Sequence, residues 1–258
     1  MKTYILLIAA FFVVSTRLNA QTWILTWSDE FEYNGLPDAT KWAYEEGKIR
    51  NKESQYYTRE RKENARVENG ALVIEARDED YNGAEHTSAS LITQGKMEFL
   101  YGRIEVRAKL PGGVGMWPAI WMLGTNRDKG WPARGEIDIM ENVGYDPDTI
   151  HANIHTQAYN HAIGTNKGSG IYVESPSEDF HIYAVEWFED HMDFFVDGQK
   201  YFTFKNEQTG NDTWPFDQPH YLILNIAVGG AWGGKHGIDE HIFPQQMLVD
   251  YVRYYQQQ

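Results

Sequence analysis

The segment Arg103-Ile104-Glu105-Val106-Arg107-Ala108-Lys109-Leu110 decides the fold class of this chain. Polar and apolar side chains alternate along it without interruption, so the polar ones share one face of a β-strand and the apolar ones share the other. The same criteria predict further strands over 71–76, 183–187, 192–196, 221–227 and 247–255. No long 3.6-residue pattern appears, which argues against a helical fold.

Turn signals separate these segments. Asn69-Gly70 and Asp197-Gly198 suit tight hairpins, and Gly112-Gly113 marks a further turn. Short strands with such punctuation predict an antiparallel β-sandwich. One sheet face of a sandwich must face outward, and a curved face makes a groove. We expect that groove to be lined by polar residues such as Arg103, Glu105 and Arg107.

Composition narrows the class of protein. The 258 residues are 42% hydrophobic and 23% charged, and no linker, repeat or low-complexity stretch divides residues 21–258, which predicts one globular domain. A formal charge of −14 argues against nucleic acid as a partner. The 9 Trp and 16 Tyr residues need a reason beyond core filling, and stacking on sugars is one candidate.

Residues 1–20 have the pattern of a secretory signal peptide. Lys2 precedes an apolar run from Tyr4 to Val14, and a short polar ending leads to Ala20. A buried N-terminal helix or strand is the alternative. We expect cleavage after Ala20 and an exported protein, secreted or periplasmic. No later segment is long and apolar enough to cross a membrane, and a cysteine-free exported chain depends on its core or on a metal for stability.

The segment Gly135-Glu136-Ile137-Asp138-Ile139-Met140-Glu141-Asn142 carries the chemical signal. Glu136 and Asp138 share a face of the strand, whereas Glu141 lies an odd number of positions from Glu136. A β-bulge near Ile139-Met140 returns Glu141 to the face of the other two acids. Crowded carboxylates repel one another and move their pKa values apart, so the arrangement is costly unless it is used.

Glycoside hydrolysis is a use that fits. Retaining enzymes need two carboxyl groups about 5–5.5 Å apart, one as nucleophile and one as acid/base. The spacing alone leaves two alternatives open, a solvated acidic strand and a site for a hard metal such as Ca²⁺.

This segment also resembles the catalytic signature of glycoside hydrolase family sixteen in its bulged form, the laminarinase (endo-β-1,3-glucanase) type. Further matches are 27–31 (WSDEF), 101–107 (YGRIEVR), 115–123 (GMWPAIWML) and 225–232 (NIAVGGAW), so the resemblance covers nearly all of 23–255. It implies a concanavalin-like β-jelly roll of two antiparallel sheets with a concave substrate cleft. It also implies retention at the anomeric carbon and no cofactor for catalysis.

The resemblance assigns roles to the three acids. Glu136 is the expected nucleophile, Glu141 is the expected acid/base with the higher pKa, and Asp138 is the supporting carboxylate.

The resemblance further implies a sugar-binding shell. Trp117 and Trp121 are four residues apart, so on a regular strand they share a face. Trp232 lies in a glycine-rich loop, and core packing is the alternative for any single tryptophan. The other implied substrate-binding positions are Asn51, Glu105, Arg107, His155 and Asn225.

Two metal hypotheses arise. His151 and His155 are four residues apart, but the Glu of a helical zinc motif is missing and the setting is a strand, so we expect no zinc pair there. The resemblance implies a structural Ca²⁺ held by the carbonyls of Glu32 and Gly70 and by the side chain of Asp250. The alternative is that Asp250 only caps a strand.

Together these observations predict an endo-acting hydrolase of laminarin-like β-1,3-glucans or mixed β-1,3/1,4-glucans. A same-fold hydrolase of another neutral polysaccharide such as a galactan, a transglycosylase, and a non-catalytic β-glucan-binding protein are the alternatives. We expect a β-glucan as partner, no nucleic acid, no membrane and a monomer.

Overall fold

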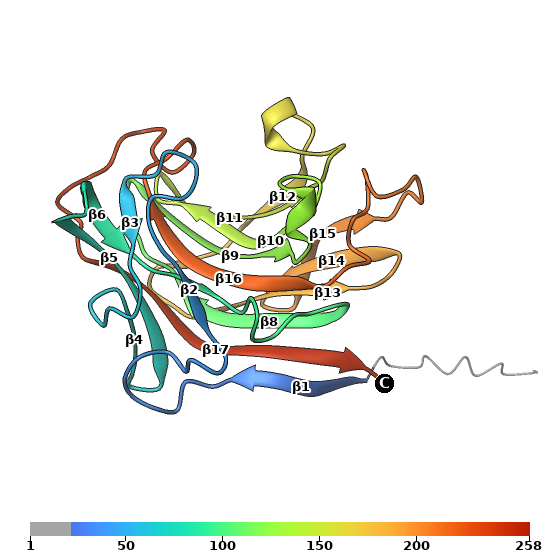
Figure 1. Cartoon of the computed structure of the whole chain (residues 1–258), viewed down its shortest axis with the longest axis horizontal. Coiled ribbons are helices and arrows are strands. Elements are labelled where there is room, and N and C mark those ends of the chain that lie inside the picture. The colour runs from blue at the N-terminus through green and yellow to red at the C-terminus, as the bar shows by residue number, and fades with distance from the viewer. Residues whose placement is uncertain (1–21) are drawn as a thin grey trace, which may run out of the picture.

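The computed structural model describes residues 22–258, which form two stacked, curved β-sheets (Figure 1). The expected signal peptide lies outside the described residues. The strands of the ten-stranded sheet are β1 (Trp23–Asp29), β3 (Gln55–Tyr57), β4 (Ala65–Glu68), β5 (Ala71–Tyr81), β6 (Ala84–Ser88), β8 (Gly102–Lys109), β13 (His181–Trp187), β14 (His191–Val196), β15 (Gln199–Lys205) and β17 (Gln245–Gln257).

The seven-stranded sheet lies against the first. Its strands are β2 (Ala43–Glu45), β7 (Ser90–Ile92), β9 (Met116–Gly124), β10 (Glu136–Val143), β11 (Asp146–His155), β12 (Lys167–Tyr172) and β16 (His220–Val228). Two 3₁₀ turns, η1 (Arg127–Lys129) and η2 (His161–Ile163), lie in the loops.

Strand order runs β15-β14-β13-β8-β17-β5-β6-β3 in the larger sheet, with β1 paired to β17 and β4 to β5, and β12-β11-β10-β9-β16-β7-β2 in the smaller. Every pair is antiparallel except β3 with β6. The predicted jelly-roll sandwich is therefore confirmed. Asn69-Gly70 and Asp197-Gly198 have positive φ angles and connect β4 to β5 and β14 to β15, as hairpins of this kind require.

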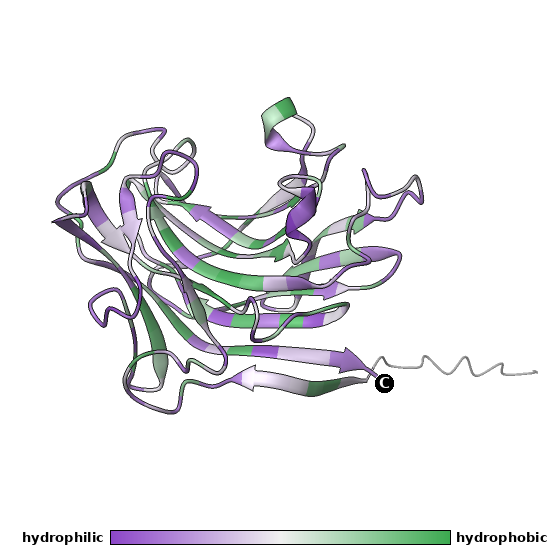
Figure 2. Cartoon of the chain, in the orientation of Figure 1, coloured by the Kyte–Doolittle hydropathy of each residue, from purple (hydrophilic) through white to green (hydrophobic). Residues whose placement is uncertain are grey.

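The core lies between the sheets and is built by alternation. Ile104, Val106 and Ala108 of β8 point inward, and Ile137 and Ile139 of β10 belong to the same buried cluster from the opposite sheet. Figure 2 shows the hydrophobic colouring concentrated along the strands, and more of the hydrophilic colouring in the loops. Each fully buried aliphatic side chain contributes about 1.5–3 kcal/mol relative to exposure, so this layer holds a cysteine-free domain together.

Alternation on β8 also corrects one prediction. Glu105 and Arg107 belong to the ten-stranded sheet and point away from the core on its outer face. There Glu105 pairs with Arg103, and Arg107 pairs with Asp250 at 2.7 Å. They do not line the cleft, which lies on the other sheet. The prediction that these residues bind substrate is wrong, because polar alternation identifies an outward face without showing which sheet carries the groove.

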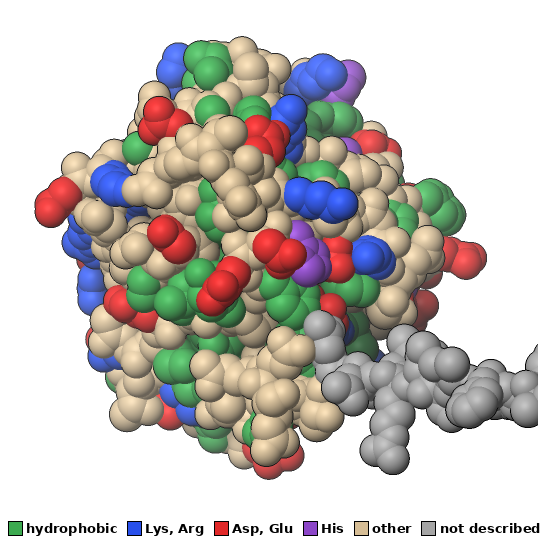
Figure 3. Space-filling model, turned by 90° about the vertical axis from the view of Figure 1, so that its right-hand side faces the viewer, with side chains coloured by type: hydrophobic (Ala, Val, Ile, Leu, Met, Phe, Trp, Pro, Cys, Tyr) green, Lys and Arg blue, Asp and Glu red, His purple; other side chains and the backbone are tan. Residues whose placement is uncertain are grey.

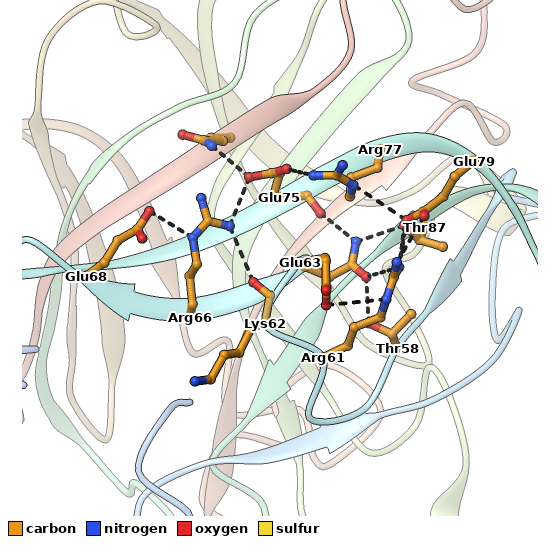
Figure 4. Close-up of polar contacts among 12 residues, drawn as sticks. Thr58, Arg61, Lys62, Glu63, Arg66, Glu68, Glu75, Arg77, Glu79 and Thr87 are labelled. Carbon is orange, nitrogen blue, oxygen red and sulfur yellow. Dashed lines mark hydrogen bonds and ion pairs between the residues drawn. The ribbon is translucent and has the colours of Figure 1, made fainter. Parts of the chain in front are cut away.

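A polar network supports one end of the larger sheet (Figure 4). Buried Glu75 of β5 accepts hydrogen bonds from Arg66 at 2.9 Å and from Arg77. Arg61 binds Glu79 through both terminal nitrogens. Bidentate pairs of this kind fix the strand edge geometrically as well as electrostatically.

The distribution of charged side chains on the surface agrees with the negative net charge of the chain. Figure 3 shows acidic and basic side chains interspersed on one face, and no continuous basic stripe on the described part of that face. Within residues 22–258, no helix is long and apolar enough to span a membrane.

Candidate active site

The three acids of β10 lie on one face because the strand is bulged. Asp138 pairs with Trp121 of β9, but Met140 pairs with Ile120, so one residue of β10 has no counterpart between them. The pairing with β11 shifts over the same interval. Glu136, Asp138 and Glu141 all line one cleft, whereas Ile137, Ile139 and Met140 are fully buried in the core. The predicted bulge is confirmed.

Glu136 lies at the end of β10 nearest the loop that carries Trp131. The indole Nε1 of Trp131 donates a hydrogen bond to Oε2 of Glu136 at 3.0 Å. His155, opposite Glu136 on β11, brings its Nε2 to 3.6 Å from the other oxygen. Burial, followed by the charge of Asp138, raises the pKa of Glu136 to about 8.

Glu141 is held at both carboxylate oxygens. Nε1 of Trp117 donates to Oε1 and Nδ2 of Asn153 donates to Oε2, each at 3.1 Å. Asn153 is itself oriented by Asn166, whose amide donates to it at 2.9 Å. Burial raises the pKa of Glu141, and the two hydrogen bonds oppose that rise. The expected order of the Glu136 and Glu141 pKa values stays a prediction.

Asp138 lies between the two glutamates in the chain and lacks their donors. Its Oδ2 is buried without a hydrogen-bond partner and lies 3.4 Å from Nε2 of His155. Burial and the charge of Glu141 raise the pKa of Asp138 well above its ordinary range. Burial and this neighbouring charge therefore favour the protonated form of Asp138.

The cleft has a volume of about 790 Å³ and brings together most of the predicted residues. Trp117 and Trp121 pair with Ala227 and Ile223 in unbroken register, so they share a face as predicted. The predicted residues that line the cleft are Asn51, Trp117, Trp121, Glu136, Asp138, Glu141, His155, Asn225 and Trp232. The ring of Trp232 lies edge-on to Trp117, 5.6 Å away between centroids.

A hydrogen-bonded chain positions the polar groups at one end of the cleft. Nε1 of Trp121 donates to Asn225 at 2.7 Å, and Asn225 donates to the hydroxyl of Tyr57 at 3.0 Å. Tyr57 in turn donates to Glu53, which also accepts from Asn51. A buried network whose members are all hydrogen-bonded holds its side chains in one arrangement, and it fixes Asn51 and Asn225 where they line the cleft.

Sequence reasoning missed several lining residues. Trp131 sits five residues before Glu136, Glu53 is nearly fully buried, and Arg50 stacks on Trp121 with its guanidinium carbon 4.8 Å from the ring centroid. Asn153 was likewise missed. The alternation of β11 was the available signal for Asn153, because that strand pairs with β10 and Asn153 lies opposite Asp138. No local pattern marks Trp131, Glu53 or Arg50, which lie outside the regular strands.

The other histidine of the predicted pair has a different setting. His151 pairs with Glu141 across the strands and packs edge-on against Trp232 at 5.2 Å between centroids. Burial lowers the pKa of His151. Within residues 22–258, neither cluster of three potential metal ligands contains His151. The expectation that His151 and His155 form no zinc pair stays a prediction.

The residues of the calcium hypothesis are not among those that line the cleft. The part of β17 up to Val249 pairs with β5, and the part from Val252 pairs with β1. Asp250 therefore lies between these two paired parts of β17. Gly70 immediately precedes β5, and Glu32 follows β1. Within residues 22–258, no hydrogen bond outside the ladders reaches the carbonyl of Glu32 or Gly70. Two carbonyls and a carboxylate are oxygen donors of the kind that Ca²⁺ takes. In this structure the carboxylate of Asp250 accepts a hydrogen bond from Arg107, and the calcium site stays a prediction.

A long aromatic cleft with paired carboxyl groups on one bulged strand of a β-sandwich defines the class: this is a glycoside hydrolase of the jelly-roll type. A family model described as glycosyl hydrolases family 16 matches residues 52–253. The chain belongs to that family.

Its relatives are close in sequence and structure. It is 54% identical to a Rhodothermus marinus protein named beta-glucanase over 246 residues, covering 92% of this chain and 86% of that one. The X-ray structure of the laminarinase from Rhodothermus marinus superposes with a TM-score of 0.91 at 53% identity, over 94% of this chain and all of that chain. A crystal structure of SCLam, described as a non-specific endo-beta-1,3(4)-glucanase, has a TM-score of 0.88 at 53% identity over 92% of each chain.

Proposed function

We propose that this enzyme hydrolyses internal β-1,3-glucosidic bonds of laminarin-like glucans, and mixed β-1,3/1,4-glucans as well, by double displacement with retention. The single observation that carries the proposal is the bulge of β10, which turns Glu136 and Glu141 into the same cleft. The names of its relatives, a beta-glucanase, a laminarinase and a non-specific endo-beta-1,3(4)-glucanase, support this choice of substrate.

In the first step Glu136 attacks the anomeric carbon and forms a covalent glycosyl-enzyme, while Glu141 gives its proton to the leaving oxygen. Glu136 must be ionised for this attack. The indole of Trp131 stabilises its anion, and a protonated Asp138 places no second negative charge beside it. Asp138 thus allows one carboxylate to ionise in a site where three could not.

In the second step Glu141, now a carboxylate, removes a proton from water, which attacks the same carbon from the opposite face. The hydrogen bonds from Trp117 and Asn153 stabilise this anionic form. They also hold the carboxyl group in one orientation while its role changes from acid to base. The enzyme needs no catalytic cofactor for either step.

The cleft residues have assigned roles in substrate binding. The indoles of Trp117, Trp121 and Trp232 present apolar surface to pyranose C–H faces. Asn51 and Asn225 offer amides to sugar hydroxyls, and His155 contacts the sugar beside the nucleophile. A sugar hydroxyl that replaces water in the second step would give transglycosylation.

Product analysis tests the proposal. Wild type and Glu136→Gln are incubated with laminarin, lichenan, curdlan and agarose, and reducing ends and oligosaccharides are measured. We expect oligosaccharides from laminarin with wild type alone. Cleavage of agarose instead would favour the galactan alternative. Equal inactivity of both proteins, with retained glucan binding, would leave the non-catalytic binding protein as the better account.

Three further properties are proposed with this function. The chain is exported through residues 1–20 and acts as a monomer, which amino-terminal sequencing and light scattering test. A structural Ca²⁺ bound by Glu32, Gly70 and Asp250 would join β17 to its neighbours. Ca²⁺ added to chelator-treated protein should then raise the melting temperature of wild type and leave that of Asp250→Ala unchanged.

A further inference from the structure

A second cluster of potential metal ligands lies outside the cleft. Within residues 22–258, two groups of three such side chains bring their ligand atoms within 4.8 Å of one another. One is Glu136, Asp138 and His155 in the active site. The other joins Asp78 of β5, His86 of β6 and Glu240 of the loop between β16 and β17. Nothing in the hydrolytic mechanism uses this second group.

His86 is built into the fold as a ligand would be. Its side chain is 1% exposed, and its ring packs on Phe243 with 4.8 Å between centroids. Nδ1 lies 2.8 Å from the hydroxyl of Ser54, and Nε2 lies 3.0 Å from Oε2 of Glu240. Metal-binding histidines characteristically use one ring nitrogen for the metal and donate the other N–H to an oxygen, here that of Ser54.

Among the described residues, no lysine or arginine balances the charge of the two carboxylates. Asp78 lies directly across the β5–β6 ladder from His86. By alternation it points away from the face of Arg77 and Glu79, whose network is shown in Figure 4. Among the described residues, no Lys or Arg forms an ion pair with Asp78 or Glu240. A divalent cation would neutralise both.

We propose that Asp78, His86 and Glu240 bind one divalent transition-metal ion, with Zn²⁺ as the best match. One imidazole and two carboxylates are a zinc-type donor set, with water as the fourth ligand, whereas Ca²⁺ takes oxygen ligands only. Ligands around tetrahedral Zn²⁺ lie about 3.3 Å apart, so the observed spacing closes with small side-chain rotations.

The ion would fasten the loop that closes one end of the cleft. This loop leaves β16 at Gly229, which bridges to Glu53, and then carries Trp232. Asp239 N bonds the carbonyl of Val114 at 3.0 Å, and Glu240 then reaches His86. Figure 1 shows the loop after β16 passing beside β5 and β6. A metal at Glu240 would therefore tie the loop to the β5–β6 hairpin.

Zinc titration tests this proposal without any substrate. Chelator-treated full-length enzyme is titrated with Zn²⁺ by calorimetry, and the melting temperature is followed. We expect one ion per chain, and a rise in melting temperature of about 5 °C at a zinc concentration one hundred times the dissociation constant. Because no glucan is present, failure of the hydrolase assignment would not affect the result.

Three variants locate the ion. Glu240→Gln, at a half-exposed position, should weaken Zn²⁺ binding at least tenfold. Glu85→Gln, next to His86 on the β5–β6 hairpin, should leave Zn²⁺ binding unchanged. Glu136→Gln should also retain full binding. Absence of zinc uptake by wild type overturns the proposal and leaves His86 and Glu240 as a hydrogen-bonded pair only. Loss of uptake in Glu136→Gln with retention in Glu240→Gln overturns it too, because the ion then lies in the cleft.

Discussion

The hydrogen bond from Trp131 to Glu136 offers a direct test of which carboxyl group is the nucleophile. Trp131→Phe removes the Nε1 donor and keeps an aromatic ring at a site that is 39% exposed, so the fold should tolerate it. The donor lowers the pKa of Glu136 against the larger effect of burial, which raises that pKa to about 8. Its removal raises the pKa further.

The magnitude follows from the strength of the bond. A hydrogen bond to a charged group is worth about 1.5–3 kcal/mol, and partial exposure of Trp131 reduces this to about 1 kcal/mol, or about 0.7 pKa unit. Glu136 must be ionised to attack, so its pKa sets the acidic limb of the kcat/KM profile. That limb should move to higher pH by about 0.7 unit, while the alkaline limb should stay in place.

The assay is kcat/KM on a laminari-oligosaccharide from pH 4 to pH 10, with Trp232→Phe as the matched control. Trp232 also lines the cleft, but its ring contacts Trp117 and His151 rather than a catalytic carboxylate. It should change KM without moving either limb. A shift of the alkaline limb in Trp131→Phe, or no shift at all, would refute the assignment of Glu136 as the group that must be ionised.

Three further predictions follow from the same geometry. Glu136→Gln should be more stable than wild type by about 4 kcal/mol at pH 8, seen as a rise of about 10 °C in melting temperature. The reason is that a carboxyl group whose pKa rises from 4.5 in the unfolded chain to about 8 in the folded chain destabilises the fold progressively as pH increases through that window; at pH 4 the gain should vanish. Glu141→Ala should stall turnover, and azide should partly restore it on substrates with good leaving groups as a β-glycosyl azide, whereas an α-azide by NMR would reverse the two roles. Trp232→Ala should raise KM about tenfold and change kcat less, since an aromatic contact of about 1.4 kcal/mol is lost; an unchanged KM would remove Trp232 from the binding site.

The alternation of polar and apolar residues predicted the strands that bury one face in the core. The apolar positions of β8, β13, β14, β16 and β17 were identified because a sheet with one buried face repeats every two residues. The bulge was predictable for the same reason. The three acids can share one face while Ile137 and Ile139 lie in the core only if the strand has one extra residue between Asp138 and Glu141.

The other features of the site depend on how distant parts of the chain come together in the fold, and local sequence patterns do not show this. Alternation in β8 could not show that its outward face lies on the opposite sheet from the cleft, so Glu105 and Arg107 were assigned wrongly. Trp131 and Glu53 reach the cleft from loops and strand ends, where no periodicity operates. The calcium ligands include two backbone carbonyls, and a carbonyl is carried by every residue, so only the family resemblance suggested them.

Covalent trapping tests the central claim most directly. A 2-deoxy-2-fluoro-β-laminaribioside with a dinitrophenolate leaving group slows breakdown of the glycosyl-enzyme, so the labelled protein can be digested and sequenced by mass spectrometry. The bulged strand predicts one label per chain, on the carboxylate of Glu136, and its release on addition of an acceptor sugar. A label on Glu141 or Asp138, or inverted product with no label, would contradict the account.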